Sequence, residues 1–284
     1  MSPGHATGRA AACPPGVLSV GAVSYLNARP LVEGLADRTD VRLIRRVPAD
    51  LYALLDRGEV DVALLPVVDL WRGEGRLRTV SDACIASQAE TLTVRVFSRR
   101  PPDRVERLHA DPDSRTSVLL ARVLWRDLYR REVQIVPLRR DVPSSDARAA
   151  DADDADAVLL IGDKVVTAAP RGYGFEVDLG GAWRHLTGLP FVFAVWAGRA
   201  EADLPGTRAR GVPDLSTAER LLASARDRGV ARAAEIAQRE AAAHGWPAAL
   251  ARRYLCETLS YTLTADMREA MARFRALANA AAPE

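Results

Sequence analysis

Residues 58–67, with the sequence GEVDVALLPV, contain the segment that decides the fold. The run 60–65 is apolar except for Asp61, which is typical of a strand in a parallel sheet that is covered on both faces. Gly58 ends the preceding helical pattern, and Pro66 stops the strand because proline has no amide hydrogen to donate to a sheet. The segment therefore indicates a buried strand of an α/β protein.

The chain before this strand alternates strands and helices. Residues 17–23 form a short apolar strand, and residues 41–47 alternate apolar and basic side chains, as in a half-buried strand. Helices are predicted to begin at Pro30 and Pro48, because proline suits the first helical position, where its missing N–H would be unpaired anyway. Two further strands complete a first βαβαβ block, at 84–87 and 92–97.

The pattern starts again after Pro101-Pro102. Residues 114–130 have the spacing of an amphipathic helix. Three more strands are predicted, at 133–138, 157–161 and 189–196. From about Asp214 the chain is predicted to be nearly all helix, with breaks near Gly229 and at 245–247.

An α/β block, a second α/β block and a helical tail are typical of bilobal binding proteins, in which the chain leaves one lobe and later returns to it. We therefore predict an α/β, two-lobed, periplasmic-binding-protein-like (type II) fold with central mixed or parallel sheets and a helical C-terminal tail. The expected boundaries are 17–98 and 190–284 for lobe 1 and 99–189 for lobe 2, with 1–16 as a disordered leader. A ligand would lie between the lobes, at the carboxyl ends of the strands.

The composition limits the kinds of partner that the protein is expected to bind. A length of 284 residues suits two domains, and a net charge of +2 does not by itself indicate a nucleic-acid or membrane partner. Lys164 is the only lysine, so arginine, backbone amides or hydroxyls are expected to hold an anionic ligand. Three widely spaced cysteines and the absence of a signal-peptide core favour a reducing, cytoplasmic location.

General motifs identify neither a metal site nor a cofactor site. The sequence has no glycine-rich phosphate loop, HExxH motif, paired-cysteine zinc motif or GxSxG elbow. We therefore expect no metal and no cofactor. On these motifs alone, a module that binds a small anion would be the default interpretation.

A family resemblance gives a more specific prediction. The opening segment VGAVSYLNARPL (20–31) resembles that of the chorismate dehydratases of the futalosine pathway of menaquinone biosynthesis. The similarity runs in order through roughly 17–277, and Tyr254, Leu255 and Tyr261 match in the tail. The other similar segments are 48–55, 58–67, 84–87, 113–120, 160–164, 178–180 and 183–196.

The resemblance implies elimination of water from chorismate to give 3-[(1-carboxyvinyl)oxy]benzoate. It implies catalytic roles for Asn27, which would contact the substrate and assist the leaving hydroxyl, and for Thr93, which stands where the family usually has serine. Asn27 has an alternative role in shaping the turn or capping a helix. The proton-removing base remains open between a protein group and the enolpyruvyl carboxylate of chorismate.

Other residues are expected to bind the substrate because they end strands or begin helices. For Ser114 or Asp113 the alternative role is helix capping, and for Arg115 it is a position in solvent. Asp163 could form a polar wall of the site or cap a helix, and capping is slightly favoured. For Tyr254 and Tyr261 a core position is favoured. The predicted binding residues are Ser24, Tyr25, Pro66, Val67, Ser87, Thr91, Ser114, Arg115, Thr116, Ser117 and Asp163.

Three other functions compete with the dehydratase. The first is a non-catalytic module that binds a small anion, and the second is a related enzyme acting on a futalosine-derived substrate. The third is a structural protein that uses the helical tail as an interaction surface. The missing signal peptide argues against an exported receptor, and the Ser24–Asn27 turn argues against the related enzyme. The sequence leaves the oligomeric state open.

Overall fold

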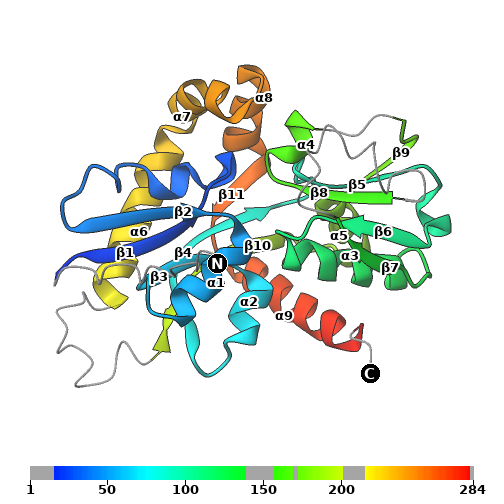
Figure 1. Ribbon diagram of the computed structural model, residues 1–284, viewed down its shortest axis with the longest axis horizontal. Helices are drawn as coiled ribbons and strands as arrows, with labels where there is room; N and C mark the ends of the chain where they lie inside the picture. Colours follow the sequence, from blue (N-terminus) through cyan, green and yellow to red (C-terminus); the bar gives the residue numbers. More distant parts are fainter. Residues whose placement is uncertain (1–15, 139–156, 169–171, 201–214, 282–284) are drawn as a thin grey trace, which may run out of the picture.

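The computed structural model describes residues 16–138, 157–168, 172–200 and 215–281, so the expected leader lies, apart from Gly16, outside the described residues. Two β-sheets lie side by side, each flanked by helices (Figure 1). Within the described part of the chain, no helix is both long enough and apolar enough to cross a membrane.

The first sheet has six strands in the order β11-β4-β10-β3-β1-β2. β1 is parallel to β2 and β3, whereas β10 is antiparallel to β3 and β4, and β11 is antiparallel to β4. The strands are β1 (Leu18–Val23), β2 (Val41–Arg46), β3 (Val62–Pro66), β4 (Leu77–Ser87), β10 (Phe191–Arg199) and β11 (Leu259–Thr262). β1 and β3 are buried along their whole length, as their apolar sequences predict.

The second sheet has five strands in the order β7-β6-β8-β5-β9. β6 is parallel to β7 and β8, while β5 is antiparallel to β8 and β9. The strands are β5 (Val94–Ser98), β6 (Arg107–Ala110), β7 (Gln134–Pro137), β8 (Ala157–Ile161) and β9 (Phe175–Asp178). Both sheets are therefore mixed, which confirms the predicted fold class.

The helices begin and end at residues with clear local signals. Pro48 begins α1 as predicted, Ser114 caps α3 by accepting a bond from the Ser117 amide, and Gly188 ends α5 with a left-handed φ of 73°. The helices are α1 (Pro48–Asp56), α2 (Val67–Arg72), α3 (Arg115–Asp127), α4 (Lys164–Thr167), α5 (Leu179–Thr187), α6 (Leu215–Ala231), α7 (Ala233–Glu240), α8 (Ala248–Arg253) and α9 (Ala265–Ala280).

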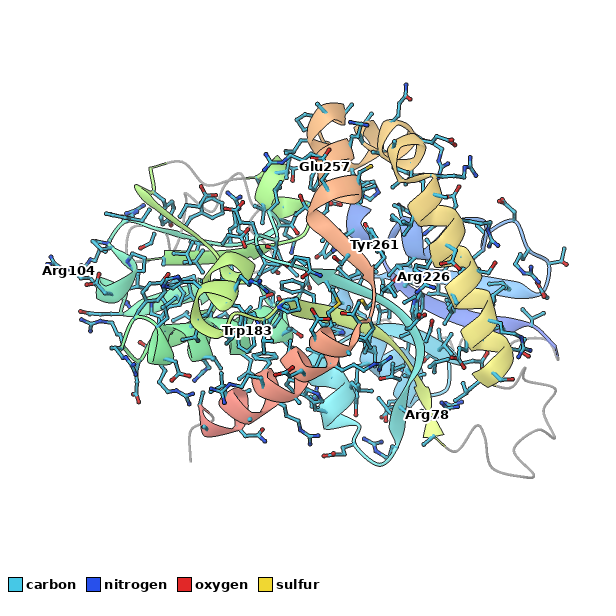
Figure 2. The ribbon with its side chains drawn as sticks, turned by 180° about the vertical axis from the view of Figure 1, so that it is seen from behind. Arg78, Arg104, Trp183, Arg226, Glu257 and Tyr261 are labelled. Atoms are coloured by element: carbon cyan, nitrogen blue, oxygen red, sulfur yellow. The ribbon has the colours of Figure 1, made fainter. Side chains whose placement is uncertain are left out.

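The structure corrects several sequence predictions. The helix predicted to begin at Pro30 is a 3-10 turn, Pro30–Val32, and a second 3-10 turn, Leu26–Ala28, precedes it. The tail, predicted to be nearly all helix, also contains one strand, because a π-helical turn, Tyr254–Thr258, leads into β11. Figure 2 shows Tyr261 on this strand. β11 was missed because it is only four residues long and gains its hydrogen bonds from β4, far away in the sequence. β6 and β9, also four residues long, were missed as well.

Sheet membership bears on where the chain changes lobe. β5 belongs to the second sheet and β10 belongs to the first. We therefore propose that each lobe consists of one sheet with its helices, and that the chain first crosses at 88–93 rather than near Ser98. The return crossing, just before β10, stays where the sequence places it, near residue 190.

An aromatic cluster joins the two halves of the molecule. Trp183 comes from α5, Phe191 from β10 and Phe274 from α9, and their ring centroids are 4.9–5.8 Å apart. All three side chains are buried, and the Trp183 indole donates a hydrogen bond of 2.9 Å to the Pro190 carbonyl. Because Phe274 contacts both Trp183 of α5 and Phe191 of β10, α9 packs against both halves of the molecule.

The helix break predicted near Gly229 lies at Arg232, between α6 and α7. Gly229 itself lies within α6, where it allows a close approach between the helix and a neighbouring turn. A Cβ atom at this position would lie 1.9 Å from the carbonyl oxygen of Pro30. We expect Gly229→Ala to destabilise the protein by about 3 kcal/mol, because the helix would have to move away from the turn. Urea unfolding measures this loss. Gly174→Ala is the control, since a Cβ there meets nothing within 4 Å. Equal unfolding midpoints for the two variants would contradict the prediction.

Candidate active site

A cavity lies between the two sheets and holds about 620 Å³ of space between atoms, part of it open to solvent. Val23, Pro66 and Ile161 line it, and each is the last residue of its strand, β1, β3 or β8. The cavity therefore occupies the place where α/β proteins bind ligands, at the carboxyl ends of strands.

Eight of the thirteen predicted site residues line this cavity. They come from the turn after β1, from the end of β3, from the segment before β5 and from the first turn of α3. They are Tyr25, Asn27, Pro66, Thr91, Thr93, Ser114, Thr116 and Ser117. The fold thus brings together residues that are as much as 92 positions apart, from Tyr25 to Ser117.

Tyr254 connects the two residues for which catalytic roles are implied. Its hydroxyl lies 2.6 Å from the Thr93 hydroxyl, and it also interacts with the Asn27 side chain. Burial raises the pKa of Tyr254, although the hydrogen bonds with Thr93 and Asn27 oppose the shift. Tyr254 is therefore protonated at neutral pH. The Asn27 Oδ1 atom is buried without a hydrogen-bond partner, so it is free to bond a ligand in the cavity.

A tightly held turn places Thr93. Leu92 has a left-handed φ of 66°, which is costly for a branched residue that is not glycine. The Asp178 carboxylate accepts bonds of 2.8–3.0 Å from the Thr91 and Leu92 amides, and it also caps α5 by accepting bonds from the Gly180 and Gly181 amides. These bonds hold the strained turn and thereby fix the direction of the Thr93 side chain.

The first turn of α3 forms another wall of the cavity. Ser114 and Ser117 are joined by the capping bond, and the Thr116 Oγ1 atom is buried without a partner. Unpaired amides and the helix dipole make a helix N-terminus favourable for an anion. This wall therefore offers hydroxyls and backbone amides to a carboxylate. None of the described residues that line the cavity is arginine or lysine.

A buried charged cluster lies behind that wall. Lys164 Nζ is 2.8 Å from both Asp111 Oδ2 and Asp113 Oδ2, and the Tyr25 hydroxyl donates a bond of 3.4 Å to Asp113. Burial and the nearby carboxylates raise the pKa of Tyr25. Tyr25 also packs against Gly162, where an added Cβ would lie 2.8 Å from the ring. The turn after β1 is thus docked on the second sheet.

Five predicted residues do not line the cavity. Arg115 pairs with Asp69 at 2.8 Å, and the Ser87 hydroxyl donates to the Ala89 carbonyl. Ser24 donates its amide to Arg46, and Val67 is buried in the core at the start of α2. The Asp163 side chain makes no capping bond for α4, which corrects the favoured interpretation; it accepts bonds from other segments instead.

Sequence analysis missed other lining residues. Tyr254 is buried, as expected, but it also faces the cavity. Its match to the family was the available signal, yet its apolar helical surroundings favoured a core role. Ile85 and Phe193 likewise looked like ordinary core residues of strands. Tyr261 is buried in the core, as expected.

Fold and cavity together define an α/β protein of the periplasmic-binding-protein-like class. A solved protein from Archaeoglobus fulgidus aligns with a TM-score of 0.64 and 15% identity, covering 93% of this chain and 97% of that one. A Candida albicans protein that exhibits the generic periplasmic-binding-protein fold aligns with a TM-score of 0.57 and 12% identity, covering 94% and 92%. At these identities the likeness concerns the fold alone.

The family assignment comes from the sequence as a whole. The family model described as "Menaquinone biosynthesis" matches residues 18–280, and the chain belongs to this family. A relative from Thermus thermophilus, named chorismate dehydratase, is 29% identical over 258 residues, which is 83% of this chain and 86% of the relative. The resemblance found in the sequence is thereby confirmed.

Proposed function

We propose that this protein is a chorismate dehydratase, which eliminates water from chorismate to give 3-[(1-carboxyvinyl)oxy]benzoate. This would be the first committed step of futalosine-dependent menaquinone biosynthesis. One observation carries the proposal: Asn27 and Thr93, from segments attached to different sheets, meet at one cavity through Tyr254. Family membership and the name of the Thermus relative support it.

The reaction removes the hydrogen at C3 and the hydroxyl at C4 of the chorismate ring. The electron pair of the C3–H bond forms the new C3–C4 double bond, while the C4–O bond breaks and hydroxide leaves with the proton as water. A carbanion at C3 is conjugated with the ring carboxylate. The protein must therefore stabilise charge on that carboxylate and assist the leaving hydroxide.

The first turn of α3 is suited to hold a substrate carboxylate. Thr116 offers a buried hydroxyl with no partner, and the helix N-terminus favours negative charge there. Asp113 also lines the cavity, and Lys164, which it shares with Asp111, partly offsets its charge. A dianionic substrate would then meet mainly hydroxyls and amides at this wall.

Asn27 and Thr93 are suited to the leaving hydroxyl. The Asn27 amide oxygen lacks a partner, so the C4 hydroxyl would donate to it in the bound state and be oriented by it. The Thr93 hydroxyl is held by Tyr254, which stays protonated, so this pair keeps neutral hydroxyl groups beside the departing oxygen. Neutral donors of this kind stabilise developing negative charge.

The enolpyruvyl carboxylate of the substrate is our proposed base. Among the described lining residues, the side chains that can ionise are Tyr25, Asp113 and Tyr254. Both tyrosines have raised pKa values, and Asp113 is engaged by Lys164. A carboxylate carried by the substrate lies close to its own C3 hydrogen, so an intramolecular transfer needs no protein base. We further propose a cytoplasmic location, since the proposed reaction is biosynthetic.

Purified protein incubated with chorismate tests the proposal. We expect 3-[(1-carboxyvinyl)oxy]benzoate to form in proportion to enzyme, as followed by chromatography and mass spectrometry. Folded protein that binds chorismate without forming product would overturn the enzymatic function and favour a binding protein of the same fold. Heat-denatured protein is the control for spontaneous breakdown of chorismate.

A further inference from the structure

We infer that Asp163 is a positioning residue: from the opposite sheet, it holds the turn that carries Asn27 by hydrogen bonds. This inference rests on the proposed function. Asp163 follows β8 of the second sheet, and its carboxylate does not line the cavity. The Leu26 amide, immediately before Asn27, lies 3.3 Å from each of its two oxygens. This contact fixes the backbone from which the Asn27 side chain projects.

The same carboxylate holds the helical tail. Asp163 Oδ2 lies 2.6 Å from His244 Nδ1, and Asp163 Oδ1 accepts a bond of 3.0 Å from Trp246 Nε1. Trp246 in turn stacks on Tyr254, with ring centroids 4.9 Å apart and planes inclined by 21°. Because Tyr254 bonds Thr93, Asp163 supports both proposed catalytic residues, one through Leu26 and the other through Trp246.

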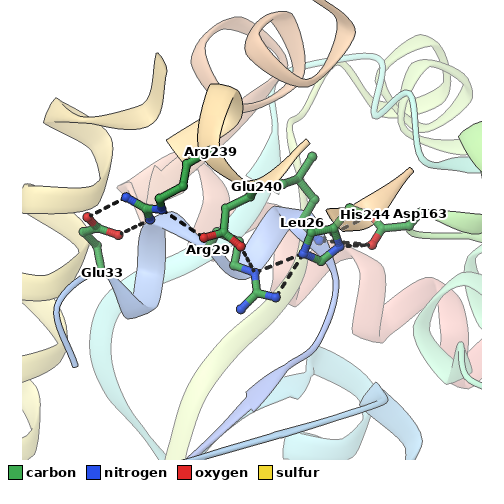
Figure 3. A network of polar contacts seen from close by, with 7 residues as sticks. All are labelled: Leu26, Arg29, Glu33, Asp163, Arg239, Glu240 and His244. Carbon is green, nitrogen blue, oxygen red and sulfur yellow. Dashed lines mark hydrogen bonds and ion pairs between the residues drawn. The ribbon is translucent and has the colours of Figure 1, made fainter. Parts of the chain in front are cut away.

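The contacts of His244 extend this network of polar contacts across the first half of the molecule. His244 Nε2 accepts a bond of 3.1 Å from Arg29 Nε. This assignment requires the tautomer in which Nδ1 carries the ring hydrogen and donates a hydrogen bond to Asp163. Figure 3 shows the polar chain passing from Asp163 through His244 and Arg29 to Glu240. It then continues through Arg239 to Glu33, with contacts of 3.0 and 2.9 Å.

A carboxylate suits this position because every partner there is a donor. The two oxygens face the Leu26 amide, the His244 ring and the Trp246 indole. An asparagine keeps one acceptor oxygen but turns an NH2 group towards one of these donors, so at least one contact is lost. Misplacement of a catalytic group by about 1 Å can reduce a rate by about a hundredfold. Asp163 therefore affects the rate of the reaction through the positions of Asn27 and Thr93.

Steady-state kinetics of Asp163→Asn test this role. We expect kcat to fall by about tenfold or more while KM changes by less than about threefold, because the groups that hold the substrate at α3 are untouched. Asp163→Glu keeps the charge and should recover part of the lost kcat. Trp246→Phe keeps the stacked ring but removes its N–H, and we expect a smaller loss of kcat, about threefold.

Hydrogen exchange of a peptide containing residues 26–29 gives a readout that does not depend on activity. In Asp163→Asn it should exchange faster than in the wild type, because the Leu26 amide loses its acceptor. Asp127→Asn is the matched control, since Asp127 pairs with Arg126 at the far end of α3 and should change neither measurement.

The outcomes separate this inference from the proposed function. Wild-type protein that forms no product overturns the dehydratase function itself. An active wild type together with a folded Asp163→Asn variant of unchanged kcat overturns the positioning role alone. If Asp163→Asn does not fold, Trp246→Phe decides in its place, and an unchanged kcat in that variant overturns the inference.

Discussion

Asn27→Ala is expected to lower kcat for chorismate by at least about a hundredfold, while the protein stays folded. Asn27 would orient the C4 hydroxyl by accepting its hydrogen bond, and misplacement of a reacting group by about 1 Å can cost about a hundredfold in rate. Asn27 is the lining residue whose amide oxygen is buried and unpaired, so the substrate is its natural partner. Alanine removes that group and leaves the 3-10 turn of the backbone in place.

The chain offers a matched control for this substitution. Asn279 is exposed on α9 and does not line the cavity. Asn279→Ala should therefore keep wild-type kcat. Product analysis by chromatography and mass, together with circular dichroism to verify folding, measures both variants. A folded Asn27→Ala protein with more than about half the wild-type kcat would remove Asn27 from the proposed mechanism.

Lys164→Met is expected to destabilise the protein by about 3 kcal/mol at neutral pH. The substitution leaves the carboxylates of Asp111 and Asp113 buried, with side-chain exposures of 1% and 9%, and without their shared cation. Removing one partner of a buried ion pair costs about 3–5 kcal/mol, and we expect the lower end because the lysine is partly exposed. Denaturant unfolding measures the loss.

The pH dependence of this difference follows from the lysine. Burial lowers the pKa of Lys164, but hydrogen bonds and charge from Asp111 and Asp113 outweigh it, so the pKa rises above the ordinary 10.5. A group whose pKa is raised by folding stabilises the protein fully below its unfolded pKa. That contribution is lost as the pH rises through the folded pKa. The difference between wild type and variant should therefore stay constant from pH 7 to about pH 10 and shrink above it.

An exposed ion pair serves as the comparison. Arg38 pairs with Asp40 on the surface, where solvent screens the charges. Arg38→Met should leave the unfolding midpoint unchanged. If Lys164→Met behaved in the same way, the buried cluster would contribute nothing to stability, and the prediction would be wrong.

The sequence by itself determined the local elements and the fold class. Residues 157–161 were predicted as a strand and form β8, and Pro48 and Ser114 stand at the helix starts where they were expected. Apolar periodicity, proline and helix caps act over a few residues, so they can be recognised without knowledge of the rest of the chain. The family resemblance added the positions of Asn27 and Thr93.

Tertiary structure alone decided how distant segments meet. β11 exists because β4 supplies its hydrogen bonds, and Tyr254 lines the cavity beside Thr93 although 161 positions separate the two residues in the sequence. Asp163 was expected to cap a helix or line the site, but its partners are Leu26, His244 and Trp246, which lie 81–137 positions away in the sequence. Such contacts depend on the path of the whole chain, and no local pattern of residues encodes them.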